Sequence, residues 1–310
     1  MKKFYVFAAV AIAALASCTK SEVVYNQGQQ EIGFRQFTGA MTKADPTALS
    51  TLAGGPTTMG VFAHINASDP YQLYFSNAKF EKPASGNVWG GNPKRYWPIK
   101  DKLDFTLYAP YVADQSASYN ATNKQLTVKV ADNTTDQHDF MYGTQRFIGK
   151  EKTASGVSVV LKHALSKVSV QIQSSNVDNL FKVTKVEIVN PIQDGSFVVT
   201  YDGSTSIAMT PGATTGTVET YSGTEKALTS SSWVDFGSKL VFPVTNNEAK
   251  LRITYNMEKA TGLIAEANLT DAWESGKHYT YNVTLTATEI LLTPTVDEWA
   301  PGTTSPITIN

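Results

Sequence analysis

The sequence predicts an all-β protein made of two β-sandwich domains. Charged residues make up only 17% of the chain and aromatic residues 11%, and β-branched residues recur in short runs, which together favour strands over helices. No long stretch has the spacing of an amphipathic helix. The length of 310 residues suggests about two domains of roughly 150 residues each. A net charge of -1 gives no basic excess of the kind that binds nucleic acid, so we expect no nucleic-acid partner.

The beginning of the chain has the features of a bacterial lipoprotein signal peptide, which we assign to 1–17. Two lysines precede an apolar core, Phe4–Leu15, that is too short for a typical membrane span. Small residues at 16 and 17 then precede Cys18, as in a lipobox. Cys18 is the only cysteine, so it has no disulfide partner in the chain, and we predict that it carries the lipid that anchors a precursor to the outer membrane. The alternative is an ordinary signal peptide with an incidental thiol.

Residues 18–45 are predicted to form a tether and a first strand. The strand is Glu31–Thr38, which places Ile32 and Phe34 on one face. The following stretch, Gly39–Thr58, is rich in Thr, Ala, Gly and Pro and is expected to be an exposed connection.

The first sandwich is assigned to 46–156. Met59–Ile65 is expected to be a buried strand, and Leu103–Ala109 alternates so that Asp104, Thr106 and Tyr108 are predicted to face outward. Another alternating strand follows around Leu126, and a short one begins near Phe140. The stretch 75–98 carries turn residues together with three aromatic residues, Trp89, Tyr96 and Trp97.

The stretch Val157–Gln173 organises the chain, because its apolar face changes from odd to even positions near Ala164–Ser166. A strand that serves one sheet cannot change face in this way without a bulge, a break or a change of sheet. We interpret it as the point where the last strand of one domain runs into the first strand of the next, with the boundary placed at 156/157. The alternative is one strand with a bulge.

The second sandwich is assigned to 157–287 and the tail to 288–310. Short strands separated by Gly, Ser and Asn turns are typical of sandwiches. The strands expected here are Val183–Val189, Gly195–Tyr201, Lys239–Val244, Leu251–Tyr255 and Tyr279–Leu285. The tail contains three prolines, and its bulky aliphatic residues include Ile290, Leu292, Val296, Ile307 and Ile309. A β-capable tail after a complete domain either closes its own sandwich or belongs to a partner.

No residue pattern predicts catalysis, a metal site or a cofactor. The four histidines are scattered without metal-ligand spacing, and His163 is expected to be a packed structural residue. Nucleophile-elbow and phosphate-loop motifs do not occur, and nothing supports a glycosidase pair among carboxylates such as Asp101, Asp104 and Asp139. The three aromatic residues of the stretch 75–98 could instead stack on sugars, which would make the protein a glycan-binding surface lipoprotein; core packing suits them better.

Several segments in order resemble the fimbrillin-like lipoproteins, the Bacteroidia-type (type V) pilins. Besides the lipobox at Cys18, the segments that carry the resemblance are Gly60–Ala63, Tyr96–Pro98, Leu103–Phe105, Tyr108–Pro110, Asp139–Tyr142, Leu161–Val168, Tyr279–Val283 and Thr295–Trp299. The resemblance implies two transthyretin-like β-sandwich domains, export as a lipoprotein and a role as a pilus subunit in adhesion.

The resemblance also implies a route of assembly. A maturation protease cuts after a basic residue and removes the first strand, here with Ile32 and Phe34, and a C-terminal strand of another pilin subunit fills the groove by β-augmentation. We expect the cut after Lys43, in the connection. Arg35 is the alternative, because the family's protease prefers arginine, although it lies within the strand. The donor strand is expected in the tail, with Ile290, Leu292, Val296, Ile307 and Ile309 as its apolar residues.

Overall fold

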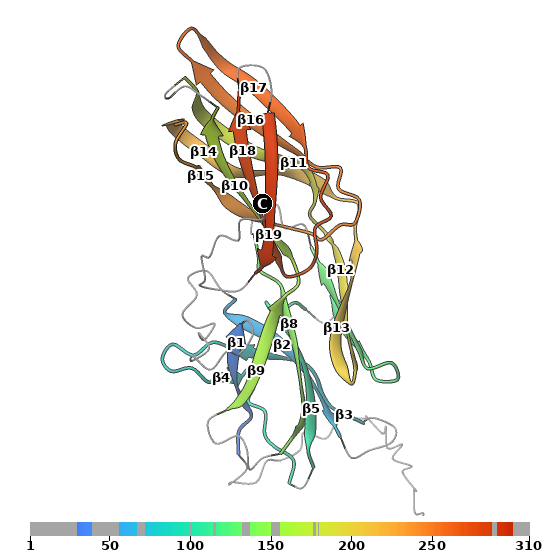
Figure 1. Cartoon of the computed structure of the whole chain (residues 1–310). Helices are drawn as coiled ribbons and strands as arrows, with labels where there is room; N and C mark the ends of the chain where they lie inside the picture. Colours follow the sequence, from blue (N-terminus) through green and yellow to red (C-terminus); the bar gives the residue numbers. More distant parts are fainter. Residues whose placement is uncertain are drawn as a thin grey trace, which may run out of the picture.

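The computed structural model describes residues 30–38, 56–66, 72–99, 101–113, 116–131, 137–149, 156–175, 178, 180–286 and 290–299. Every regular element in these ranges is a β-strand, and they contain no helix long and apolar enough to span a membrane (Figure 1). The all-β prediction is therefore confirmed. The signal peptide, Cys18, Lys43, Ile307 and Ile309 lie outside the described residues.

Seven strands of the first half form a closed barrel (lower part of Figure 1). In spatial order they are β1 (Gly33–Thr38), β4 (Trp89–Gly91), β3 (Gln72–Glu81), β2 (Thr58–Ile65), β5 (Leu103–Ala109), β8 (Met141–Ile148) and β9 (Val157–His163). Inward side chains such as Phe80, Trp97 and Phe105 fill its interior and are almost completely buried. The first half is thus a closed barrel, where the sequence predicts a β-sandwich, because β1 is paired on both sides.

A second sheet covers one outer face of this barrel. It consists of β13 (Ser204–Pro211), β12 (Gly195–Asp202), β7 (Gln125–Val130) and β6 (Ala117–Asn120), so the hairpin β12–β13 from the second half of the chain extends beside the barrel (Figure 1). Leu126 and Phe197 from this sheet pack with Phe62 and Tyr108 from the barrel's outer face.

This cover corrects the prediction for β5. All seven of its residues are buried, including Asp104, Thr106 and Tyr108, which the alternation placed toward solvent. The Tyr108 hydroxyl donates a 2.6 Å hydrogen bond to Oδ1 of Asn77, so its polar atom is satisfied in the interior. Period-two alternation shows that a strand has two faces but not whether a second layer covers the polar one.

The chain changes sheet between β9 and β10 (Ser166–Ser174), where the apolar phase shifts in the sequence. β9 pairs with β8 and β1, whereas β10 pairs with β15 (Val234–Val241) and β18 (Lys277–Leu285). The two strands are separate, so the alternative of one bulged strand is wrong. The boundary placed at 156/157 would assign β9 to the second half, but its hydrogen bonds place it in the barrel.

Two four-stranded sheets face each other in the second half. One contains β15, β10, β18 and β19 (Ile290–Glu298), and the other contains β14 (Thr215–Ala227), β11 (Lys182–Ile192), β16 (Lys250–Met257) and β17 (Ala260–Asn268). Both sheets contribute to one apolar core, in which Nε1 of Trp273 donates a 3.0 Å hydrogen bond to the Tyr281 hydroxyl. The two halves lie end to end, so the molecule is elongated (Figure 1).

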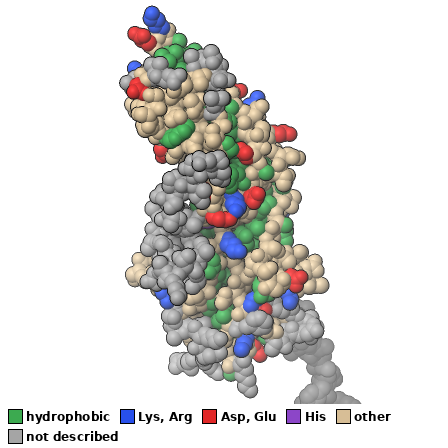
Figure 2. All heavy atoms as spheres, viewed as in Figure 1, with side chains coloured by type: hydrophobic (Ala, Val, Ile, Leu, Met, Phe, Trp, Pro, Cys, Tyr) green, Lys and Arg blue, Asp and Glu red, His purple; other side chains and the backbone are tan. Residues whose placement is uncertain are grey.

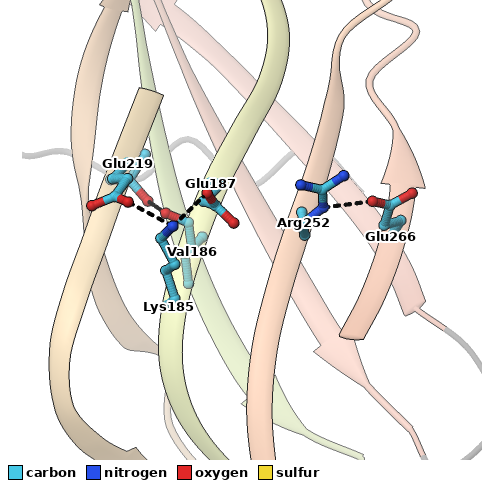
Figure 3. Close-up of polar contacts among 7 residues, drawn as sticks. Lys185, Val186, Glu187, Glu219, Arg252 and Glu266 are labelled. Atoms are coloured by element: carbon cyan, nitrogen blue, oxygen red, sulfur yellow. Dashed lines mark hydrogen bonds and ion pairs between the residues drawn. The ribbon is translucent and has the colours of Figure 1, made fainter. Parts of the chain in front are cut away.

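The outer face of the β14–β11–β16–β17 sheet carries paired charges. The Lys185 ammonium lies 2.7 Å from a carboxylate oxygen of Glu187 and 2.6 Å from one of Glu219, and Nε of Arg252 lies 2.6 Å from Glu266 on β17 (Figure 3). The Lys185–Glu219 and Arg252–Glu266 pairs join neighbouring strands and are partly exposed, so each contributes about 1 kcal/mol or less. Glu187 lies on the same strand as Lys185 and is 8% exposed. On the face shown in Figure 2, basic and acidic side chains are likewise intermixed. This outer face is therefore a solvated one.

Candidate functional site

β1 closes the barrel by pairing on both of its edges. It runs parallel to β9 over five positions, from Phe34 opposite Val157 to Thr38 opposite Leu161, and antiparallel to β4 at Gly33 and Phe34. Just before the strand, the amide of Ile32 donates a 2.7 Å hydrogen bond to the carbonyl of Arg95. The predicted first strand is therefore present, and it lies within the sheet rather than at an edge.

The side chains of Ile32 and Phe34 fill the barrel core. Both are completely buried. The Phe34 ring packs edge-on against Phe80 and Phe105, with ring centroids 5.0 Å apart in both pairs and interplanar angles of 79° and 90°. Burial of an Ile or Phe side chain stabilises a fold by about 1.5–3 kcal/mol. Removal of β1 would leave an apolar groove between β4 and β9.

The opposite face of β1 is closely covered by Val88. A Cβ atom added to Gly33 would lie 2.5 Å from Cγ1 of Val88 and 3.4 Å from the carbonyl oxygen of Trp89. Gly156, just before β9, has a φ of +87° and lies beneath the same valine, 3.2 Å from its Cγ1 measured in the same way. Two glycines from different segments therefore meet under one side chain that is itself 38% exposed.

Of the two basic residues considered as sites of proteolytic maturation, only Arg35 lies within the described residues. Arg35 lies within β1, with its backbone opposite Ser158 of β9 and its side chain half-buried. Proteases cleave hydrogen-bonded strands poorly, since they prefer exposed loops. Lys43 falls outside the described residues.

β19 lies at the edge of its own sheet. It pairs antiparallel with β18 over nine positions, from Ile290 opposite Leu285 to Glu298 opposite Lys277. Pro294, which cannot donate a ladder hydrogen bond, is tolerated because the strand is at an edge. Leu292 packs against the core, whereas Val296 is 44% exposed. This part of the tail therefore closes its own sandwich in the state described.

The residue after β19 is attached to the junction between the two halves. The indole of Trp299 stacks on the ring of His163 at the end of β9, and the Trp299 amide donates a 2.9 Å hydrogen bond to the carbonyl of Gly276. Nδ1 of His163 lies 3.0 Å from Oδ2 of Asp139. Burial raises the pKa of the Asp139 carboxyl, and the hydrogen bond with His163 opposes that shift. The prediction that His163 is a packed structural residue is confirmed by its 5% exposure.

The aromatic residues considered for sugar stacking do not form a binding platform. Trp89 and Trp97 are each 1% exposed, and both belong to the barrel core. The main-chain carbonyl of Tyr96 accepts a 2.9 Å hydrogen bond from the Tyr74 hydroxyl. Among the residues that the structure describes, no three His, Cys, Asp or Glu side chains lie close enough together to hold a metal ion.

Comparison with known proteins gives one family and a set of similar folds. Residues 42–299 match the fimbrillin-like family. A fimbrial protein from Bacteroides vulgatus superimposes with a TM-score of 0.61 at 18% identity, over 87% of this chain and 99% of that one. A candidate cell adhesion protein from Bacteroides uniformis gives a TM-score of 0.55 at 18% identity, over 87% of this chain and 99% of that one. Another, from Bacteroides ovatus, gives a TM-score of 0.55 at 16% identity, over 88% of this chain and 99% of that one. A search of curated proteins found no match.

Proposed function

Because the chain belongs to the fimbrillin-like family, we propose that it is a structural subunit of a cell-surface pilus that supports adhesion. The family is one of fimbrial structural proteins and not of enzymes. The proposal includes export as a lipoprotein precursor, proteolytic maturation and polymerisation by donor-strand insertion. Its partners are other pilin subunits, a maturation protease, the outer membrane through the lipid on Cys18, and a ligand on a host or bacterial surface.

The observation that carries the proposal is the place of β1. It contributes Ile32 and Phe34 to the barrel core, yet it joins the rest of the chain only through the connection that leads from Thr38 to β2. A cut in this connection would leave β1 held by non-covalent contacts alone. Once β1 leaves, the other six strands no longer close, and the first half becomes the open transthyretin-like sandwich that accepts a donor.

A replacement strand would find backbone partners on both sides of the groove. β4 and β9 run in opposite directions, so a strand entering either way is antiparallel to one of them. A strand that entered in the direction of β1 would restore the parallel pairs with β9, its longer partner, and the antiparallel pairs with β4. Exchange of β1 for such a strand is β-augmentation at an internal position.

Maturation in this proposal follows anchoring at Cys18. A cut after Lys43 releases all of β1, including its paired residues through Thr38. A cut after Arg35 would leave Gln36–Thr38 on the β9 side of the groove and block part of it. Lys43 is therefore the preferred position.

The donor is proposed to be the C-terminal tail. Donation of Ile290, Leu292 and Val296 would require β19 to separate from β18 along nine paired positions. Donation of Ile307 and Ile309 requires none of these pairs to break. We therefore assign the first contact with a neighbouring subunit to Ile307 and Ile309, with β19 remaining on its own sheet.

The experiment that tests the proposal is the recovery of the protein from the cell surface. A pilus subunit should be recovered without β1, with Ala44 as its first residue, and in multimers that survive mild denaturant. A surface lipoprotein that captures glycans would instead retain the acylated Cys18 and remain monomeric. Recovery of only acylated, monomeric protein would contradict the proposal.

A further inference from the structure

We infer that the groove left by β1 selects a donor strand with an aliphatic residue, a glycine and an aromatic residue in succession, supplied by a protein other than this chain. The inference rests on the proposed function, since it names the partner for the same groove. It follows from the fit of Ile32, Gly33 and Phe34, which occupy the groove in the structure.

The aromatic requirement comes from the position of Phe34. Its ring makes two edge-on contacts at 5.0 Å, with Phe80 from β3 and Phe105 from β5, and all three side chains are completely buried. Edge-to-face packing is specific to aromatic rings. The barrel wall surrounds this position, so a smaller side chain would leave a void that the closely packed core cannot easily fill.

The glycine requirement comes from Val88 on the opposite face of the strand. Any side chain at the Gly33 position would begin 2.5 Å from Cγ1 of Val88 and 3.4 Å from the main-chain oxygen of Trp89. The valine would have to move, and a β-branched residue would require the largest movement. Val88 therefore determines which residues fit at the Gly33 position. Because Val88 lies on the opposite face of the strand from the barrel core, it can be changed without altering the core-facing side of the groove.

The chain's own tail does not have this pattern. Its last β-capable segment is Ile307-Thr308-Ile309, which places a β-branched residue between two aliphatic ones, and residues 300–310 contain no aromatic residue. The one aromatic residue from position 290 onward is Trp299, whose ring is stacked on His163 of the same subunit. The tail thus mismatches the groove at two positions, and a strand from a different subunit type fits better.

The test uses the full chain with a specific protease site between Ala44 and Asp45. After cleavage, peptides compete with β1 for the groove, and native mass spectrometry identifies the bound strand. The peptide Glu31–Thr38 should exchange in, whereas versions with Phe34→Ala or Gly33→Val should bind at least about tenfold more weakly. The peptide Thr303–Asn310 should also bind weakly, and the double change Thr308→Gly and Ile309→Phe should strengthen it.

A matched variant separates the two requirements. In a Val88→Ala protein the atom nearest to the Gly33 position is absent, so a Gly33→Ala peptide should bind as tightly as the unaltered peptide, while Phe34→Ala should still weaken binding. Equal binding of the Phe34→Ala and unaltered peptides, or binding of the natural tail peptide as tightly as Glu31–Thr38, would overturn the inference and leave the pilus proposal standing. Failure of Glu31–Thr38 itself to exchange would overturn the proposed strand exchange and the inference together.

Discussion

The indole of Trp299 lies almost parallel to the imidazole of His163, with 3.7 Å between the ring centroids and 11° between the planes. His163 is the last residue of β9, which pairs with β1, and Trp299 directly follows β19. The stacked pair therefore joins the end of the C-terminal edge strand to the barrel that holds the first strand. The candidate acceptor and the base of the candidate donor meet at one junction.

Loss of this stack should loosen β19. The change Trp299→Ala removes the ring contact and part of the buried apolar area, and we expect a loss of about 1–3 kcal/mol in the free energy of unfolding. Denaturant unfolding measures the loss, and hydrogen exchange should show faster exchange in β19 and β18. Trp233, which is 42% exposed, provides the control, and Trp233→Ala should change stability by less than about 0.5 kcal/mol. Equal effects of the two changes would show that the stack does not hold the strand.

The layer between the barrel and its covering sheet contains a buried polar cluster. His64 of β2 is 1% exposed, and its ring lies 4.3 Å from that of Tyr119 on β6. Near it, Nη2 of Arg146 donates a 3.2 Å hydrogen bond to Thr106, and Asn66 donates a 2.7 Å hydrogen bond to Asp104.

This cluster should make stability fall in mild acid. Burial, and after it the Arg146 charge, lower the pKa of His64 from 6.5 to about 4, although the Asp104 charge acts in the opposite direction. In the unfolded chain, His64 binds a proton as the pH falls below 6.5, whereas in the folded chain it binds one only near pH 4. Stability is therefore lost as the pH falls from 6.5 to about 4. The loss is about 3 kcal/mol, since a tenfold difference in proton affinity is worth about 1.4 kcal/mol.

The variant His64→Gln tests this origin of the acid sensitivity. Glutamine does not titrate, so the variant should lose less stability than the wild type between pH 7 and pH 4, whatever its stability at pH 7. Denaturant unfolding at several pH values gives both slopes. Parallel curves for the two proteins would assign the acid sensitivity to other groups.

Strands with one apolar and one polar face could be predicted from the sequence, whereas strands that are largely exposed or irregular could not. β10 and β18 have one buried face, and their period-two pattern is visible in the sequence. β13, β14 and β17 were missed because they are largely exposed and rich in Ser, Thr, Gly and Glu, so no apolar period marks them. β3 was missed because only three of its ten residues are buried and its burial follows no regular alternation.

At the candidate site, too, local residue patterns could be predicted from the sequence, whereas tertiary pairing could not. Ile32 and Phe34 could be identified as one face of a strand from their spacing alone. That the strand closes a barrel beside β9 could not be predicted, because parallel pairing between residues 34–38 and 157–161 depends on tertiary arrangement rather than local pattern. The role of Val88 over Gly33 depends in the same way on two segments that are distant in the sequence.

Lipid attachment is expected at Cys18 and nowhere else, because the chain has no other cysteine. The change Cys18→Ala should abolish incorporation of radiolabelled fatty acid and should either release the precursor or stall it before it reaches the outer membrane. Cys18→Ser is a closer match in size and should behave in the same way. Incorporation of label into either variant would refute the assignment.

Maturation should depend on Lys43 more than on Arg35. The change Lys43→Gln should leave β1 attached and reduce multimers, because the strand that fills the groove is not released. Arg35→Gln should have little effect, since the peptide bond after Arg35 lies in a paired strand. N-terminal sequencing of surface protein from both variants measures the outcome. A mature chain that begins at Gln36 would reverse the assignment, and one that begins at neither Gln36 nor Ala44 would remove both candidates.

Deletion of Thr303–Asn310 should separate folding from polymerisation. The deletion leaves β19 and Trp299 intact, so all nine pairs with β18 and the stack on His163 remain, and the subunit should melt at the wild-type temperature. It should be exported and cut, but it should not donate a strand to a neighbour, so the denaturant-resistant multimers in which this chain is the donor should disappear. A longer deletion from Ile290 is the contrasting variant, because it removes the edge strand and the packing of Leu292 and should destabilise the second half. If the short deletion alone unfolds the protein, the last residues are part of its own sandwich. If the truncated protein melts normally and still forms ladders of multimers, the donor strand lies elsewhere in the chain.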